Sequence, residues 1–192
     1  PTDMGVNMAG CCIFDDEVCK EASKAEIIRR YYRARTDLKK GAVGPEVPER
    51  IKLLMNELDI SEKDRAVATE ATKKRESVDG LPSACVKVGK KYITGKKTSN
   101  LSPVSSTMLN AIKAISRIPE DMDLIAPAVL EPILEIKNKT SNFQESHLNI
   151  GEVLIALSIC SSTNPVAKKA LSNLEKLRGA QFHATHMIPD DE

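Results

Sequence analysis

The stretch VDGLPSACVKVGKKYITGKK, residues 78–97, decides the fold. Gly80 and Pro82 disfavour the continuation of a helix, and two short runs with β-branched residues, 84–88 and 92–94, flank Gly89. This pattern predicts a β-hairpin. A sheet therefore enters the chain at this point, and the segments on either side must be arranged around it.

Before the hairpin, apolar residues recur every three or four positions, which is the spacing of one helix face. The spacing predicts a helix from about residue 15 to residue 40 and a second one over residues 48–60. Ser61 and Asp64 have the spacing of a capping box and predict a third helix that runs to about residue 76. We interpret residues 1–14 as an extended junction segment and residues 15–79 as a helical subdomain.

After the hairpin, Ser102 and Pro103 form an N-cap and first-turn pair, which predicts a helix to about residue 115. A strand over residues 122–126, MDLIA, precedes three further helices and a final strand in AQFHATHMI. Strands that alternate with helices predict an α/β subdomain over residues 80–192. The expected fold class is mixed α/β, with a helical N-terminal segment followed by a small mixed sheet packed with helices.

The composition limits the partners of the chain. Its 28 Lys and Arg residues balance 27 Asp and Glu residues, and aromatic residues make up 3% with no Trp, so we expect no nucleic-acid binding. The strongly apolar run at residues 153–160 is far shorter than the ~20 residues of a membrane-spanning helix, so we expect no membrane insertion. Five cysteines without ligand or disulfide spacing, and no signal-peptide pattern, favour a cytoplasmic protein.

The chain opens with PTDMGVNMAGCC, without an initiator Met or a helix-starting pattern. We interpret this opening as the interior of a longer protein or as a processed terminus. The segment MGVNMAGCCIF is too apolar for a free tail, so we expect it to contribute to an exposed apolar surface. Such a surface predicts self-association into a homo-oligomer.

The two histidines of FHATH do not predict a metal site. His183 and His186 are three positions apart, and side chains of a strand alternate between faces, so the two point to opposite sides. Cys11, Cys12 and Cys19 lack the spacing of zinc ligands. We expect no metal, and the sequence indicates no particular cofactor. His183 is either an ordinary hydrogen-bonded residue or a proton-transfer group.

The segment TGKKTSNLS, residues 94–102, resembles part of a phosphate-binding turn but lacks the full P-loop pattern. A strand ends at Thr94, Gly95 allows a close backbone approach, Lys96 adds a charge, and a helix starts near Ser102. These features predict a modest site for phosphate or a phosphorylated small molecule. The alternative is a solvated lysine turn in which Ser102 only caps the helix.

A second basic feature lies in EIIRRYYRAR. Arg29 and Arg33 share one helix face and form either an anion clamp or a solvated or interface surface. The face that carries Tyr31, Tyr32 and Arg33 also supports an alternative function, a non-catalytic oligomerisation or interaction module.

Six stretches taken in order resemble the later part of an uncharacterised bacterial family, domain of unknown function eighteen forty-six. The resemblance spans essentially the whole chain. It implies a longer cytosolic protein whose preceding portion is an α/β domain with a Gly-rich, P-loop-like segment, and that portion is expected to be missing here. The stretches are PTDMGVNMAG, DDEVCKEASKAEIIRRYY, ITGKKTSNL, LIAPAVLEPI, EVLIALSICSSTNP and KLRGAQFHATHMI.

The family has no settled activity, so the resemblance leaves open whether the chain is an enzyme. Together with the features of residues 94–102, it leads us to expect that the chain binds, and in the fuller hypothesis transforms, a phosphate-bearing small molecule at a cleft with the missing N-terminal domain. Lys96 would hold the anion, and His183 would be the catalytic residue that orients or exchanges a proton. Lys97 stands where the family pattern has a small hydroxyl residue. The implied site residues are Thr2, Asp3, Gly5, Asn7, Thr94, Lys96, His183 and Thr185.

Overall fold

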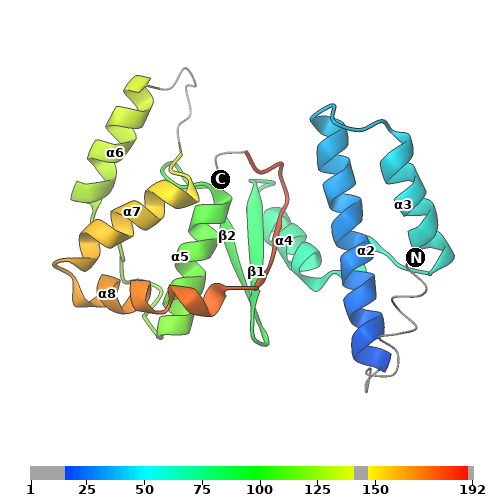
Figure 1. The fold of residues 1–192 in the computed structure, drawn as a ribbon. Helices are drawn as coiled ribbons and strands as arrows, with labels where there is room; N and C mark the ends of the chain where they lie inside the picture. Colours follow the sequence, from blue (N-terminus) through cyan, green and yellow to red (C-terminus); the bar gives the residue numbers. More distant parts are fainter. Residues whose placement is uncertain (1–15, 141–146, 190–192) are drawn as a thin grey trace. The chain divides into compact units, whose positions relative to one another are not determined.

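The computed structural model of the chain describes residues 16–140 and 147–189. These residues form seven α-helices, two short 3₁₀ helices and a three-stranded antiparallel sheet, which confirms the mixed α/β class (Figure 1). They divide into two compact units, one that ends at Arg65 and one that begins at Ala66, and each unit is described by itself. None of the described helices is long and apolar enough to cross a membrane.

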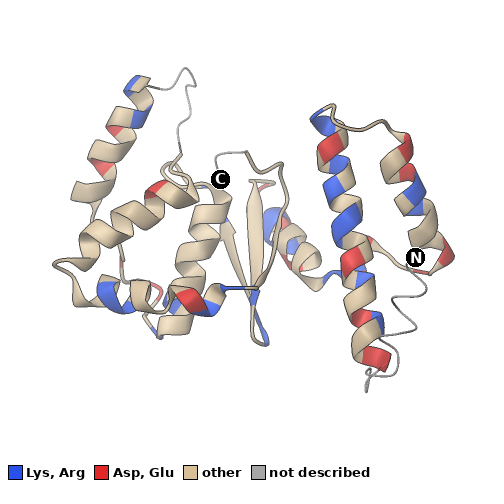
Figure 2. Cartoon of the chain, viewed as in Figure 1, with Lys and Arg blue, Asp and Glu red and all other residues tan. Residues whose placement is uncertain are grey.

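The first unit is a pair of helices, α2 (Asp16–Lys39) and α3 (Glu46–Glu57), which confirms the two helices expected there. Acidic and basic side chains alternate along α2 (Figure 2). The unit has a small core in which Ile28, Met55 and Ile60 are buried. Gly41, which follows α2, has a φ of +73°, a left-handed conformation that suits glycine at the end of a helix.

The third expected helix begins later than the sequence indicates. Ser61 and Asp64 form the capping box, with Ser61 N donating to Asp64 Oδ2 at 2.6 Å, but the box starts a 3₁₀ turn (Glu62–Asp64). Arg65 is extended, so the α-helix α4 starts afresh and spans Ala66–Glu76. Val67 and Ala71 of α4 pack on Cys85 of the sheet. The structure thus groups α4 with the sheet, whereas the sequence places the division after residue 79.

The hairpin consists of β1 (Ser83–Val88) and β2 (Lys91–Lys96), with Gly89 at a φ of +58° in the turn. The final strand, β3 (Gln181–Ala184), pairs with the other edge of β1, so the strand order is β2-β1-β3. The predicted hairpin and the predicted final strand are confirmed, although β3 stops at Ala184. The register sets Cys85 opposite Thr94 and His183, which places these three residues on one face of the sheet.

Helices cover both faces of the sheet, with α4 on the Cys85 face and α5 (Pro103–Ser116) on the opposite face (Figure 1). The main core lies on the α5 side, where Val86 packs with Ala111, Ile112 and Leu157. The remaining elements that enclose this core are α6 (Pro127–Thr140), α7 (Ile150–Ser161), α8 (Pro165–Ser172) and the 3₁₀ helix Leu174–Leu177.

The strand predicted over residues 122–126 is wrong. Leu124 and Ile125 are buried in the main core, but they lie in a loop. Arg117 ends α5 in a left-handed conformation and Pro127 opens α6, so the intervening residues turn twice and form no ladder with the sheet. A short apolar run carries no periodicity that would separate a strand from a buried loop. The helix α6 continues through Pro132.

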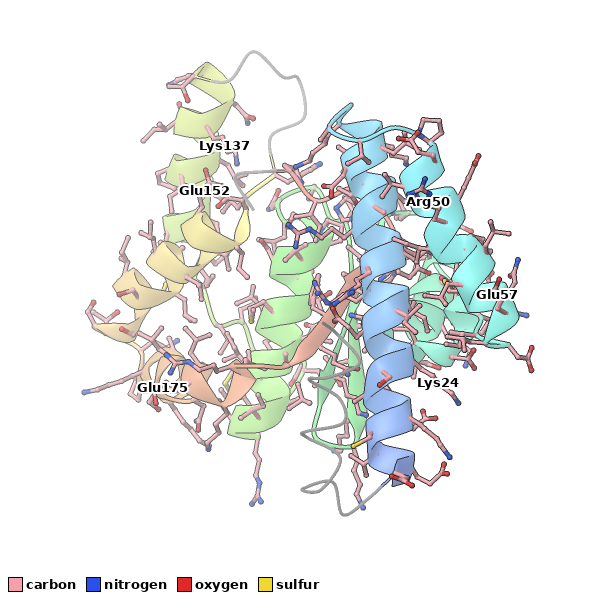
Figure 3. All side chains as sticks on the ribbon, turned by 45° about the vertical axis from the view of Figure 1, so that its right-hand side comes forward. Lys24, Arg50, Glu57, Lys137, Glu152 and Glu175 are labelled. Carbon is pink, nitrogen blue, oxygen red and sulfur yellow. The ribbon has the colours of Figure 1, made fainter. Side chains whose placement is uncertain are left out.

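A partly buried ion pair joins α6 to α7. Lys137 Nζ lies 2.7 Å from Glu152 Oε2 and 2.8 Å from His147 O, and the labelled Lys137 and Glu152 face each other in Figure 3. Glu152 also accepts a hydrogen bond from Asn149 N at 2.8 Å, which completes a capping box. One carboxylate thus stabilises the start of α7 and connects it to α6.

Candidate functional site

A cleft of about 350 Å³ lies beside the edge strand β2. Its walls come from the end of β2, the segment between β2 and α5, one side of α5, the loop that precedes α6, the start of α6, and a single residue of α4, Lys74. All of these elements belong to the unit that begins at Ala66. The described residues that line the cleft therefore all belong to one compact unit.

The wall between β2 and α5 exists because of Gly95. A Cβ added to Gly95 would meet the backbone at Ser106 and Thr107 and would lie 2.6 Å from Thr107 Oγ1. The missing side chain thus lets α5 pack directly on β2, and the expectation that Gly95 allows the approach of an anion is corrected. Next to it, Asn110 Nδ2 donates to Thr94 O at 2.9 Å and occupies an edge-strand carbonyl.

The cleft carries an excess of positive charge. Lys74 and Lys96 line it, and neither forms an ion pair with another residue in the part of the chain that the structure describes. A third lysine of the lining, Lys113, donates from Nζ to Glu120 O at 2.9 Å. The only carboxylate among the described lining residues is that of Asp123. Such a concave surface attracts an anion.

Ser106 is the unusual polar residue of the lining. It is 8% exposed, and its Oγ is buried without a hydrogen-bond partner among the described residues. Its neighbours differ, since Ser105 Oγ donates to Leu148 O at 3.0 Å and Thr107 Oγ1 donates to Pro103 O at 2.7 Å. A buried hydroxyl without a partner costs about 1–3 kcal/mol, a penalty that a ligand oxygen would remove.

The start of α5 does not provide the anion site that the sequence predicts. Pro103 has no N–H, Ser105 N donates to Ser102 Oγ at 3.0 Å, and Ser106 N donates to Ser102 O at 3.0 Å. Ser102 N in turn donates to Leu148 O at 3.2 Å, and Ser102 is buried. Ser102 therefore caps α5, which is the role that the alternative gave it. The side of α5 lines the cleft, and its N-terminus does not.

The structure brings together two of the predicted site residues. Thr94 and Lys96 both line the cleft, whereas His183 and Thr185 lie at β3, on the other side of β1, and do not line it. A proton-transfer role for His183 at a ligand in this cleft therefore has no geometric support. The predicted residues Thr2, Asp3, Gly5 and Asn7 lie outside the described residues.

Thr185 holds the sheet together. Its Oγ1 donates to Ser83 O and accepts from Ser83 N, both at 3.0 Å, and its own N–H donates to Ser83 O at 2.9 Å. These bonds continue the pairing of β1 with the chain after Ala184. The hydroxyl is thus fully used in the fold, which explains its presence without a ligand.

Two titratable side chains near the sheet, those of Cys85 and His186, are not activated. Burial raises the pKa of the Cys85 thiol to about 11, so it stays protonated. Burial, with a smaller effect of Lys97, lowers the pKa of His186, which therefore stays neutral at pH 7. Within residues 16–140 and 147–189, no three His, Cys, Asp or Glu side chains gather into a group that could hold a metal. Cys11 and Cys12 fall outside these ranges.

The sequence missed five polar residues of the cleft. Ser106, Asn110 and Lys113 follow the spacing i, i+4, i+7 and form a polar stripe on a helix whose other side packs in the core, so this pattern was readable. Lys74 and Asp123 come from elements far apart in sequence, and only the tertiary structure brings them into the same cleft as Lys96.

The arginines of α2 are already paired. Arg29 Nε and Nη2 lie 2.6 and 2.7 Å from the Glu26 carboxylate, and Arg30 Nε lies 2.9 Å from it. These hydrogen bonds lower the pKa of Glu26 to about 2. Tyr32 Oη donates to Glu62 Oε2 at 2.8 Å. Of the two alternatives for this face, the solvated, internally paired surface describes it better than an anion clamp.

Comparison with known proteins places the whole chain in one family. Residues 1–59 match the model described as domain of unknown function DUF1846, N-terminal, and residues 63–192 match the model of its C-terminal domain. The expectation that only the later part of the family is represented is therefore wrong, since the match includes the N-terminal domain model.

Curated relatives from two bacteria carry the family name UPF0371. The protein of Clostridium botulinum strain Eklund 17B is 42% identical over 196 residues, which cover 98% of this chain and 39% of the relative. The protein of Fusobacterium nucleatum is 42% identical over 200 residues, which cover 98% of this chain and 40% of the relative. The chain thus spans about two fifths of the length of these relatives. Because the C-terminal model alone covers more than half of its residues, the chain belongs to the uncharacterised DUF1846 family.

Proposed function

We propose that the cleft beside β2 binds a phosphate-bearing small molecule. One observation carries the proposal: two lysines that form no ion pair with a described residue line the same cleft as a buried serine hydroxyl that lacks a hydrogen bond. Lysine ammonium groups and hydroxyl donors are the groups that proteins use to bind phosphate oxygens. The arrangement supports binding, and it supplies no argument for a particular reaction.

The three groups lie at the same end of the cleft. Lys96 ends β2 and pairs with Ser83, and α4 ends only a few residues before Ser83, so Lys74 on its last turns lies at that end of the sheet. Ser106 packs beside Gly95, the neighbour of Lys96. A phosphate at this position would accept hydrogen bonds from two ammonium groups and one hydroxyl.

Calorimetric titration of inorganic phosphate into the 192-residue chain tests the proposal. Replacing Lys96 by Ala removes a charge-assisted contact worth about 1.5–3 kcal/mol, so the Kd is expected to rise by roughly 10- to 100-fold. Lys74→Ala is expected to act in the same direction. Binding should need no magnesium and should weaken as salt is added.

The matched control is Lys90→Ala, which removes the same charge from the exposed turn of the hairpin, outside the cleft lining. This control should leave the affinity unchanged. Equal phosphate affinities for the wild type, Lys96→Ala and Lys74→Ala would mean that residues 94–102 form an ordinary basic turn.

A second candidate function is self-association, which a different observation favours. The Tyr31 and Tyr32 side chains pack against the core of their own unit, so the face predicted to bind another subunit is largely used internally. On α3, however, Leu53, Leu54 and Leu58 are 62%, 43% and 51% exposed. We propose that a second copy of the chain covers this surface.

Sedimentation velocity across a wide concentration range tests this second candidate. The wild type should associate, and Leu54→Glu should shift it to the monomer because the substitution places a charge in the apolar contact. Exposed Lys20→Glu on α2 is a control that changes charge without removing an apolar side chain. A monomer at all concentrations would exclude this candidate.

A further inference from the structure

The cleft has two chemically different ends. The contacts of Gly95 with Ser106 and Thr107, and of Thr94 with Asn110, mean that α5 runs opposite to β2. Lys113, one turn beyond Asn110, therefore lies away from Lys96. Its Nζ donates to Glu120 O at 2.9 Å. Glu120 is close in the chain to Asp123, which provides the carboxylate of the lining. One end thus offers two lysines, and from its closeness in the chain to Glu120 we place the Asp123 carboxylate toward the other end, where Lys113 lies.

The wall between these ends is aliphatic and hydroxylated. Leucine and isoleucine side chains from α5, α6 and the loop before α6 provide the apolar surface, and two threonines and an asparagine provide polar groups. None of the described lining residues is aromatic, so the cleft offers no ring on which a nucleobase would stack. The apolar residues are Leu101, Leu109, Leu124, Ile125 and Leu130, and the polar ones are Thr94, Thr98 and Asn110.

The size of the cleft also limits the ligand. Its volume of about 350 Å³ lies at the lower end of the range of about 300–1,000 Å³ that small-molecule sites occupy. A ligand that contacts both charged ends must span the cleft with its own skeleton. Such a ligand is compact and carries polar groups at both ends.

From this arrangement, and resting on the proposed function, we infer that the ligand is the phosphate monoester of a small hydroxylated carbon skeleton, a sugar or polyol phosphate, and not a nucleotide. The phosphate lies at Lys74, Lys96 and Ser106. The hydroxyl groups at the far end donate to the Asp123 carboxylate, and the C–H face of the skeleton lies on the leucine wall. Asp123 would repel a second anionic group, so a skeleton with one phosphate fits better than one with two.

Titration of three probes into the full 192-residue chain tests this assignment. Ribose 5-phosphate should bind at least about tenfold more tightly than inorganic phosphate, because it adds contacts along the wall and at Asp123. Adenosine monophosphate should bind less tightly than ribose 5-phosphate, since its base finds neither room nor a stacking partner. The assignment is overturned if ribose 5-phosphate is no tighter than phosphate or if the nucleotide binds best.

The variant Asp123→Asn separates the two ends. It should weaken ribose 5-phosphate by about tenfold and leave inorganic phosphate unchanged or slightly tighter, because a neutral amide accepts more weakly and repels less. Asp121→Asn, an exposed neighbour outside the lining, is the matched control and should change neither affinity. An unchanged ribose 5-phosphate affinity in Asp123→Asn overturns the inference alone, whereas the absence of phosphate binding in the wild type overturns the proposed function itself.

Discussion

The helical unit and the cleft of the α/β unit differ in how their positive charges are paired. In the helical unit, Arg29 and Arg30 share the Glu26 carboxylate, and Lys52 and Arg35 lie 3.6 and 3.9 Å from Glu62. In the cleft of the α/β unit, Lys74 and Lys96 form no such pair with a described residue. The number of positive charges is therefore a poor guide to a binding site. What distinguishes the cleft is that Lys74 and Lys96 form no ion pair with a described residue and line the same cleft as the unsatisfied Ser106 hydroxyl.

The units also differ in the size of their cores. The helical unit buries Ile28, Met55 and Ile60, whereas the α/β unit has a continuous core over its sheet that includes Leu157 at 0% exposure. A larger core excludes water more completely and holds side chains in fixed positions. The α/β unit is thus the better scaffold for a site, and the substitutions that follow test this scaffold first.

The largest effect is expected from Leu157→Ala. Removing a fully buried leucine costs about 2–5 kcal/mol because it leaves a cavity in the core. Thermal or denaturant unfolding of the variant measures the loss. Ile155→Ala on the same helix is the control, since Ile155 is 62% exposed and its truncation should cost far less. Equal losses for both variants would contradict the core described for this unit.

Gly95→Ala should have the next largest effect. The new methyl group would collide with the backbone of α5 at Ser106 and Thr107, which cannot rotate away, so we expect a loss of about 1–3 kcal/mol. Gly151→Ala in α7 is a matched control, because its added Cβ meets nothing closer than 3.5 Å. That control should be neutral or slightly stabilising, since alanine favours a helix more than glycine does.

Thr185→Val should destabilise the sheet by about 1–2 kcal/mol, because it removes the hydroxyl that bonds both Ser83 N and Ser83 O. The variant keeps the size of the side chain, and Thr185→Ser keeps the hydroxyl. Denaturant midpoints should therefore rank the serine variant above the valine variant. Phosphate affinity should stay unchanged in both variants. A loss of phosphate affinity in Thr185→Val without a loss of stability would indicate that Thr185 belongs to the binding site.

His186 gives the smallest expected effect, and it depends on pH. Because its pKa is lowered in the folded state, the unfolded chain binds the proton more readily, and stability falls as the pH drops through and below the ordinary value of 6.5. The melting temperature of His186→Asn should fall less than that of the wild type between about pH 7.5 and about pH 5.5. Identical pH dependence in both proteins would contradict the burial of this imidazole.

Only part of the fold could be predicted from the sequence. The pair Ser102–Pro103 predicted a helix start correctly because capping is a local effect, with both partners within three residues. The strand predicted at residues 122–126 is a loop, because an apolar run is equally suited to a strand and to a buried loop. Local patterns predict where most helices and strands lie. Whether a short apolar run becomes a strand or a buried loop depends on tertiary packing.

The candidate site shows the same limit. Thr94 and Lys96 were predicted from one short segment, and they do line the cleft. The role of Gly95 was misread, because the partner of its backbone is α5, which the sequence alone does not place. Lys74 and Asp123 join the cleft through the packing of α4 and of the loop before α6, for which no local pattern exists.

The most direct test of the central claim is a ¹H–¹⁵N chemical-shift titration of the chain with inorganic phosphate. We expect the shifts to concentrate on residues 94–98 and 106–110, with smaller ones at Lys74, and we expect Lys96→Ala to abolish them at the same phosphate concentration. The arginine-rich surface of α2 should show none, because its charges are already paired. Shifts centred on residues 26–33, or no saturable shifts along β2 and α5, would contradict the claim that the cleft is the anion site.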